Sequence, residues 1–141
     1  MTKIYYDSKF ARFLLPKRFS GITLFERVFF KEKEVFVSKT MVNHELIHVE
    51  QQKESVILAV LFSILLLGIF NSFIISMLAF LSFYYLVYLF EYIFLLFKFK
   101  FDKQKAYKKI SFEQEAYANQ DDINYIKNER KHFAWIHYFG C

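Results

Sequence analysis

Residues 56–97 read VILAVLFSILLLGIFNSFIISMLAFLSFYYLVYLFEYIFLLF, and this stretch decides the fold because Glu91 is its single charged residue. As one straight helix it would extend about 63 Å at about 1.5 Å per residue, twice the roughly 30 Å hydrocarbon core of a bilayer. We therefore expect the chain to fold back at Gly68–Ser72 (GIFNS), the polar interruption near the middle. The resulting spans, Val56–Phe70 and Phe73–Tyr92, predict a transmembrane hairpin, with Glu91 at the interfacial end of the second span.

The composition favours a small membrane protein over a soluble one with a buried hairpin. Apolar residues make up 55% of the 141 residues and aromatic residues 22%, with three Gly and one Pro. Soluble domains carry less apolar material, and so small a domain could hardly cover this hairpin. The length predicts a single domain, residues 1–141, with one site. The single cysteine, Cys141, excludes an internal disulfide framework and a cysteine-rich zinc site.

Basic residues flank the apolar block, and the formal net charge is +5. Fourteen of the 19 Lys and Arg residues fall in three clusters: Lys3, Lys9, Arg12, Lys17 and Arg18; Lys98, Lys100, Lys103, Lys105, Lys108 and Lys109; Lys127, Arg130 and Lys131. Such charges favour the cytoplasmic side and anionic lipid headgroups. We therefore expect a protein integral to the cytoplasmic (inner) membrane, with both termini and the active site on the cytoplasmic side. The lipid bilayer, rather than nucleic acid, is its expected partner. The opening residues lack the apolar core of a cleaved signal peptide, so we expect the N-terminus to be retained.

The segment before the hairpin contains a short region typical of β-structure. Residues 1–40 are expected to hold a small N-terminal β-hairpin over Ile22–Val37, which is rich in Phe, Val, Ile and Thr. The charged Lys31–Glu34 (KEKE) is the expected turn between its strands. Residues 41–55 are predicted to form a helix that runs into the hairpin of residues 56–97.

The segment after the hairpin, residues 98–141, predicts cytoplasmic helices. Ser111–Gln114 has the S-x-x-Q form of a capping box, which begins a helix expected to reach about Asn128. Arg130–Phe139 mixes basic and aromatic residues and predicts an interfacial C-terminal helix. The predicted fold class is mainly α and integral to the membrane.

The sequence HELIH at residues 44–48 is a candidate metal site. On a helix, His44 and His48 lie one turn apart on the same face, so both imidazoles can reach one tetrahedral Zn²⁺ ion. Glu45 is placed to act as general base toward a water whose pKa the zinc ion lowers. A random order of these residues would produce such a match in roughly one case in a hundred, so the motif needs a third ligand to support it.

The third ligand is expected from Glu113 or Glu115, beyond the hairpin. The two side chains point about 160° apart on one helix, so only one of them can face a given ion. Glu115 lies at about 60° from the mean direction of Phe112, Ala116, Ile123 and Ile126, and Glu113 at about 100° on the other side. We therefore prefer Glu115, with Asn119 available to orient a ligand, and keep Glu113 as the alternative. His132 and His137 are interpreted as interfacial polar residues.

These elements together resemble the membrane-embedded gluzincin metalloproteases, the group of the CAAX prenyl proteases, heat-shock membrane proteases and antibiotic-sensing membrane metalloproteases. They are also similar to small uncharacterised bacterial membrane proteins that pair HExxH with an EAY motif. The resemblance implies zinc ligands His44 and His48, general base Glu45 and a Glu ligand in a Glu-x-x-Ala-Asp pattern. Residues 115–119 (EAYAN) match this pattern with Asn in the Asp place, and residues 113–117 (EQEAY) match it with Tyr there.

The first functional hypothesis is a membrane-bound zinc metallopeptidase that hydrolyses peptide bonds of a peptide or protein substrate at the cytoplasmic membrane face. The second is a non-catalytic membrane protein with a structural or sensory zinc site and a protein partner. The third is a membrane assembly subunit without a metal, in which HELIH is a solvated helix face. The sequence leaves the substrate and the oligomeric state open.

Overall fold

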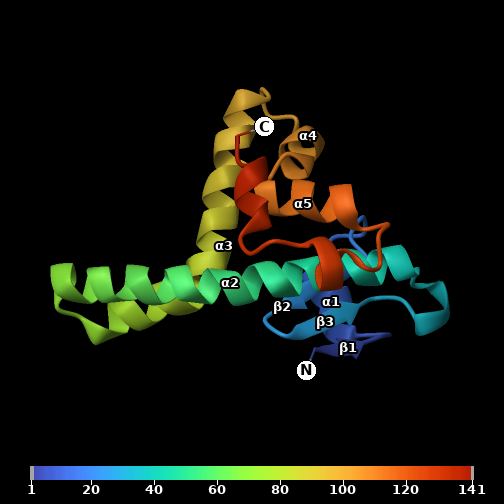
Figure 1. Ribbon diagram of the computed structural model, residues 1–141, viewed down its shortest axis with the longest axis horizontal. Coiled ribbons are helices and arrows are strands. Elements are labelled where there is room, and N and C mark those ends of the chain that lie inside the picture. Colours follow the sequence, from blue (N-terminus) through green and yellow to red (C-terminus); the bar gives the residue numbers. More distant parts are fainter. Residues whose placement is uncertain (1, 141) are drawn as a thin grey trace. The chain divides into compact units, whose positions relative to one another are not determined.

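A computed structural model describes residues 2–140 and is mainly helical, with one three-stranded sheet (Figure 1). The chain forms two compact units. The first contains the residues up to Glu50 and Glu115–Lys131, and the second contains Gln51–Gln114 and the residues from His132 onward. The chain passes between the units at residues 50/51 and 114/115, inside helices, and at 131/132, between helices, and the single domain stays a prediction. Cys141 lies outside the described residues.

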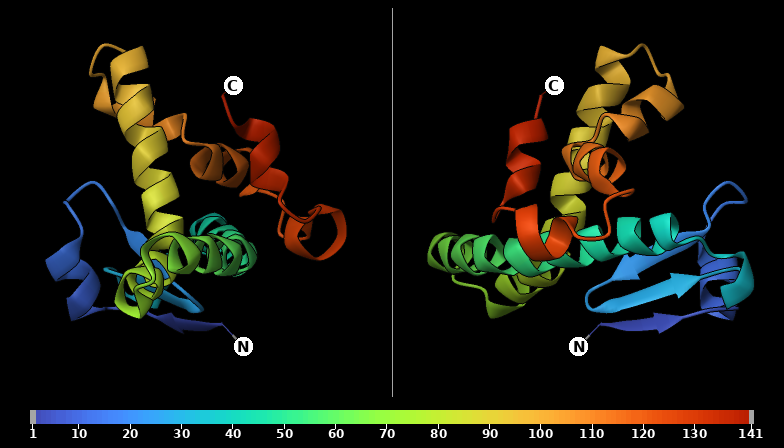
Figure 2. Two further views of the ribbon diagram at one scale, coloured as in Figure 1. Left: turned by 90° about the vertical axis from the view of Figure 1, so that its left-hand side faces the viewer. Right: turned by 45° about the vertical axis from the view of Figure 1, so that its right-hand side comes forward.

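The first unit contains the sheet, whose strands are β1 (Lys3–Tyr5), β2 (Gly21–Leu24) and β3 (Arg27–Phe30). The strand order is β1-β3-β2, with β1 parallel and β2 antiparallel to β3. The short helix α1 (Lys9–Leu14) lies close to one end of the strands (Figure 2), and the Ser8 side chain caps it.

The predicted β-hairpin is present, but its turn was predicted in the wrong place. Leu24 pairs with Arg27, so Phe25 and Glu26 form a two-residue turn, and Phe25 adopts a positive φ of 53°. Tight hairpin turns need such a conformation, which Gly and Asn adopt most readily, and Phe gives no sequence signal for it. The KEKE segment follows β3 and leads into a 3₁₀ turn, Glu34–Phe36. The parallel strand β1 was not predicted.

One face of the sheet packs against the beginning of α2 (Lys39–Phe70). Val28 and Phe30 of β3 and Val49 of α2 are buried together, and Met41 and Val42 are packed against them. Because side chains alternate across a strand, Val28 and Phe30 point to the same face. This packing places the HELIH turn of α2 beside strand β2.

The second unit contains the rest of α2 and helix α3 (Phe73–Lys98). The predicted break between them is confirmed: α2 ends at Phe70, Asn71 has a positive φ of 47°, and the Ser72 side chain caps α3. Both helices are long and apolar enough to cross a membrane. In the most apolar 18-residue stretch of each helix, only 17% of the residues of α2 and 11% of those of α3 are buried. A core helix of a soluble protein would be mostly buried.

The segment after α3 is less helical than predicted. It contains α4 (Lys103–Lys108), α5 (Ser111–Asn119), a π-helical turn (Tyr125–Glu129) and a 3₁₀ helix (Ala134–Tyr138). Helix α5 therefore ends at Asn119 rather than near Asn128, because the chain turns at residues 120–124 before the π-helical turn begins.

One further prediction for this segment was wrong. The Ser111 hydroxyl does not cap its own helix but donates to Glu91 at 2.7 Å, so a carboxylate of α3 takes over the role predicted for the capping box. The predicted C-terminal helix is present as the shorter 3₁₀ helix Ala134–Tyr138, whose Trp135 is 6% exposed and packs against Phe112 with ring centroids 4.5 Å apart; its interfacial position stays a prediction.

Candidate metal centre

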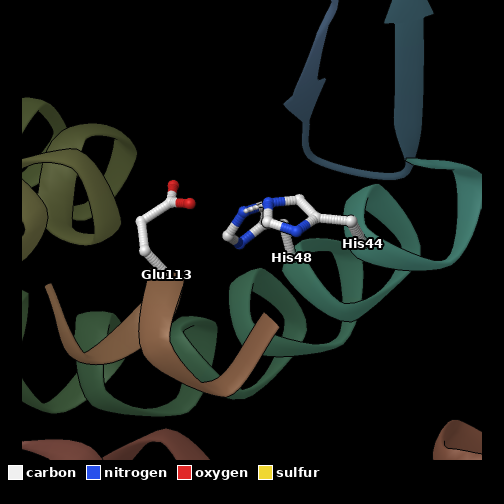
Figure 3. A group of neighbouring side chains, drawn as sticks. All are labelled: His44, His48 and Glu113. Atoms are coloured by element: carbon white, nitrogen blue, oxygen red, sulfur yellow. Dashed lines mark hydrogen bonds between the residues drawn. The ribbon is translucent and has the colours of Figure 1, made fainter. Parts of the chain in front are cut away.

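His44 and His48 lie on one face of α2 with their imidazole rings close together (Figure 3). Their Nε2 atoms are 3.2 Å apart. Two nitrogen ligands at about 2.0–2.1 Å from one tetrahedral ion lie roughly 3.3 Å apart. The paired imidazoles therefore have the separation that one shared zinc ion requires.

Gln120 orients the first imidazole. The Nδ1 atom of His44 lies 3.0 Å from the Gln120 Oε1 atom. With this carbonyl oxygen as acceptor, Nδ1 carries the proton and Nε2 presents its lone pair, which is the tautomer that a metal ligand needs. The Tyr117 ring also contacts the His44 ring edge-on, with centroids 4.8 Å apart.

The loop that carries Gln120 is held by Asn43, the residue before His44. The buried Asn43 amide nitrogen donates to three backbone carbonyls, those of Asn119 (3.3 Å), Gln120 (2.9 Å) and Asp122 (2.9 Å). Carbonyls at the end of a helix have no hydrogen-bond partner within the helix, so the Asn43 amide supplies a donor that they would otherwise lack. Asn119, which we expected to orient a ligand, instead donates to the backbone carbonyl of Glu115 at 2.8 Å.

Glu113 of α5 joins the two histidines. One ligand atom from each of His44, His48 and Glu113 can be chosen so that all lie within 4.8 Å of one another (Figure 3). His48 and Glu113 are 7% and 3% exposed. The Tyr88 hydroxyl of α3 donates to Glu113 Oε1 at 3.0 Å. The carboxylate of Glu113 is therefore fixed by a neighbour.

The preference for Glu115 is not supported, because Glu115 serves a different purpose. Its carboxylate accepts from Arg130 Nε at 2.7 Å and from the Tyr125 hydroxyl at 3.2 Å. The two side chains of this ion pair are 0% and 5% exposed for Glu115 and Arg130. A buried charge needs such a partner, and Glu115 holds the π-helical turn on α5.

Glu45 is held by strand β2. The Thr23 hydroxyl lies 2.7 Å from Glu45 Oε2 and 3.1 Å from the Glu45 backbone oxygen. Thr23 is 5% exposed. Gly21 of the same strand lies so close that an added Cβ would be 3.0 Å from Glu45 Oε1. The Glu45 carboxylate is thus confined between the helix and the edge of the sheet.

The donor set fits zinc. Two imidazole nitrogens and one carboxylate oxygen are the ligands of many catalytic zinc sites, which keep a fourth position open. The His44–Glu113 group meets this requirement without a sulfur ligand. Of the remaining histidines, His132 lies 3.6 Å from Glu54 and His137 is in the 3₁₀ helix near the C-terminus.

Sequence reasoning missed the residues that orient the group, namely Thr23, Asn43, Tyr88 and Gln120. Asn43 and Gln120 carry a weak signal, because Asn43 directly precedes the motif and Gln120 directly follows the EAYAN segment. Thr23 and Tyr88 carry none, since their contacts join elements distant in sequence. Comparison of the chain with protein-family models, with curated proteins and with solved structures finds no match.

Proposed function

We propose that this protein is a membrane-bound zinc metallopeptidase that cleaves a peptide bond beside the membrane. The observation that carries this proposal is the His44, His48 and Glu113 group, with Glu45 next to His44 on the same helix. This is the combination of ligands and base that HExxH hydrolases use. The resemblance to the gluzincins supports the same proposal.

In this mechanism, His44, His48 and Glu113 would hold the ion. A zinc ion held there would supply Lewis acidity, which lowers the pKa of a water and polarises a carbonyl group. Glu45 accepts the proton of the attacking water and returns it to the departing amine. Thr23 restrains the rotation of the Glu45 carboxylate, and a base held in one orientation is more effective than a mobile one.

The distances along α2 and α3 support a position at the membrane surface. Gln51 and Glu91 each lie 20 residues from Asn71 at the tip of the hairpin. Twenty helical residues extend about 30 Å, the thickness of the hydrocarbon core. Helix α2 becomes polar at this point, with buried Gln51, Gln52, Glu54 and Ser55, and α3 carries a buried charged residue, Glu91, at the same distance from the tip. His48 lies one turn beyond Gln51, where water and a polar substrate reach the ion, and the flanking basic residues favour the cytoplasmic side.

Strand β2 offers a way to align the substrate. It is an edge strand, since the sheet order is β1-β3-β2 and β2 pairs with β3 alone among the described strands. An extended peptide can add to such an edge through main-chain hydrogen bonds. Because Thr23 of β2 contacts Glu45, a peptide on this strand would lie beside the base.

The test measures zinc content and peptide-library hydrolysis on the same detergent-purified samples. Wild type is expected to bind about one zinc per chain and to cleave library peptides, and Glu45→Gln to keep zinc but lose hydrolysis by about 10²–10⁴-fold. Glu34→Gln, which changes an exposed carboxylate, is the matched control and is expected to behave as wild type. Wild type without bound zinc would refute the proposal.

A second function is favoured by the burial of His48 and Glu113. A closed, buried ligand set is typical of structural zinc sites. In that case the protein would use zinc to hold a surface for a protein partner. Zinc binding without cleavage of any library peptide, and no difference between wild type and Glu45→Gln, would favour this function over the peptidase.

A further inference from the structure

We propose that one face of helix α3 positions the third metal ligand: Tyr88 orients the Glu113 carboxylate, and Glu91 fixes the start of the helix that carries it. This inference rests on the proposed metal site and adds two positioning residues to it. Both lie within the second unit, as do Ser111 and Glu113.

The contact of Tyr88 is direct. Its hydroxyl donates to Glu113 Oε1 at 3.0 Å. The Tyr88 ring stacks on Phe112, the residue before Glu113, with an interplanar angle of 4° and centroids 6.4 Å apart. The stacked ring restrains the hydroxyl, and the hydroxyl restrains the rotation of the carboxylate. A hydrogen bond to one oxygen of a ligating carboxylate holds it in a single binding orientation.

Glu91 acts on the backbone of the same helix. Its carboxylate accepts from the Ser111 backbone N–H at 2.9 Å and from the Ser111 hydroxyl at 2.7 Å. Glu91 is 6% exposed and Ser111 is fully buried. Ser111 begins α5, and a negative charge at a helix N-terminus is stabilised by unpaired N–H groups and by the helix dipole. This contact fixes where α5 begins, two residues before Glu113.

Tyr88 and Glu91 are three residues apart, so they lie on the same face of α3. The aromatic core around Phe112, Trp135 and Leu95 fills the space next to that face. One helix face therefore sets both the position and the orientation of Glu113. If α3 spans the membrane as proposed, a displacement of α3 would be transmitted to the zinc affinity.

The test compares zinc affinity and the visible spectrum of the Co²⁺-substituted protein in Tyr88→Phe and wild type. Loss of the hydroxyl is expected to weaken zinc about 10-fold and to shift the Co²⁺ absorption bands, because contacts of this kind typically contribute 10–100-fold in affinity. Tyr85→Phe is the matched control, since Tyr85 is an exposed tyrosine of the same helix, and it is expected to leave both measurements unchanged.

A double-mutant cycle separates an effect through Glu113 from a general loss of packing. If Tyr88 acts through Glu113, then Tyr88→Phe should weaken zinc no further in a Glu113→Ala background. If Tyr88→Phe lowers the yield of folded protein, Ser111→Ala is the second test. It removes the hydroxyl contact to Glu91 and keeps the backbone contact, and it is expected to weaken zinc about twofold to fivefold.

The outcomes distinguish this inference from the proposed function. Zinc affinity and Co²⁺ spectra equal to wild type in both Tyr88→Phe and Ser111→Ala would overturn the positioning role while the metal site stands. Wild type that binds neither zinc nor Co²⁺ would overturn the metal site and the positioning role together.

Discussion

Thr23 of β2 donates its hydroxyl hydrogen bond to Glu45 of α2 over 2.7 Å, and this contact joins the edge of the sheet to the proposed catalytic base. Thr23 also lies 3.1 Å from the Glu45 backbone oxygen. The Thr23 side chain thus contacts both the carboxylate and the backbone carbonyl of Glu45. The small sheet therefore contacts the proposed catalytic base directly.

Thr23→Val should keep zinc and lower kcat by about 10- to 100-fold, because the Glu45 carboxylate loses the group that fixes its orientation. Thr23→Ser retains the hydroxyl and should restore most of the rate. Hydrolysis of the best library peptide, measured with zinc content, checks this prediction. Equal rates for the Val and Ser variants would show that the contact does not position the base.

Glu113→Ala and Glu115→Ala should affect different properties of the protein, the first its zinc binding and the second its stability. Loss of Glu113 should abolish tight zinc binding and leave the helical content unchanged. Loss of Glu115 leaves Arg130 buried without its carboxylate and should destabilise the chain by about 3–5 kcal/mol. Zinc titration and thermal unfolding on both variants check this. If the Glu115 variant folds but binds no zinc while the Glu113 variant still binds it, Glu115 is the third ligand, as the sequence analysis preferred.

Gln120→Ala should weaken zinc binding by about 10-fold, because His44 loses the acceptor that holds its Nδ1 proton. Asn128→Ala, which changes an exposed amide of the π-helical turn, is the matched control. Competitive zinc titration with a chelator dye measures both. Equal affinities for the two variants would argue against an orienting role for Gln120.

The proposed hairpin predicts that its tip and the basic segment after it lie on opposite sides of the membrane. Ile69→Cys and Lys103→Cys, each in a Cys141→Ser background, should react with an impermeant thiol reagent from opposite sides. Ile69 is chosen because Asn71 has a positive φ and Ser72 caps α3, so both resist substitution. Labelling of both cysteines from the same side would rule out this topology.

The hairpin and the histidine pair could be predicted from sequence because both depend on local patterns. A polar break in a long apolar run has few structural solutions, and four-residue spacing places two histidines on one helix face. The turn at Phe25 and the pairing of β1 with β3 could not be predicted, since the turn contains none of the usual residues and the pairing joins distant segments.

The preference for Glu115 over Glu113 rested on a helix longer than the observed one. The expected helix included Ile123 and Ile126, which shifted its apolar direction toward Glu115. The observed helix ends at Asn119, so Phe112 and Ala116 define its buried side. From their mean direction Glu113 and Glu115 each deviate by about 80°, on opposite sides. The two glutamates differ in that Glu115 pairs with Arg130. The position of Arg130 depends on a turn that the sequence pattern does not reveal.

The three carbonyls that Asn43 binds hold residues 119–122 against the histidine helix through contacts that need no ion. Small zinc domains often unfold when the metal is removed, because the metal supplies their folding energy. In this protein the Asn43 hydrogen bonds contribute to folding without a metal. A chelator should therefore remove the ion while the circular dichroism spectrum stays constant. Removal and re-addition of the metal would then switch the proposed activity off and on reversibly. Other divalent ions could replace zinc without a refolding step.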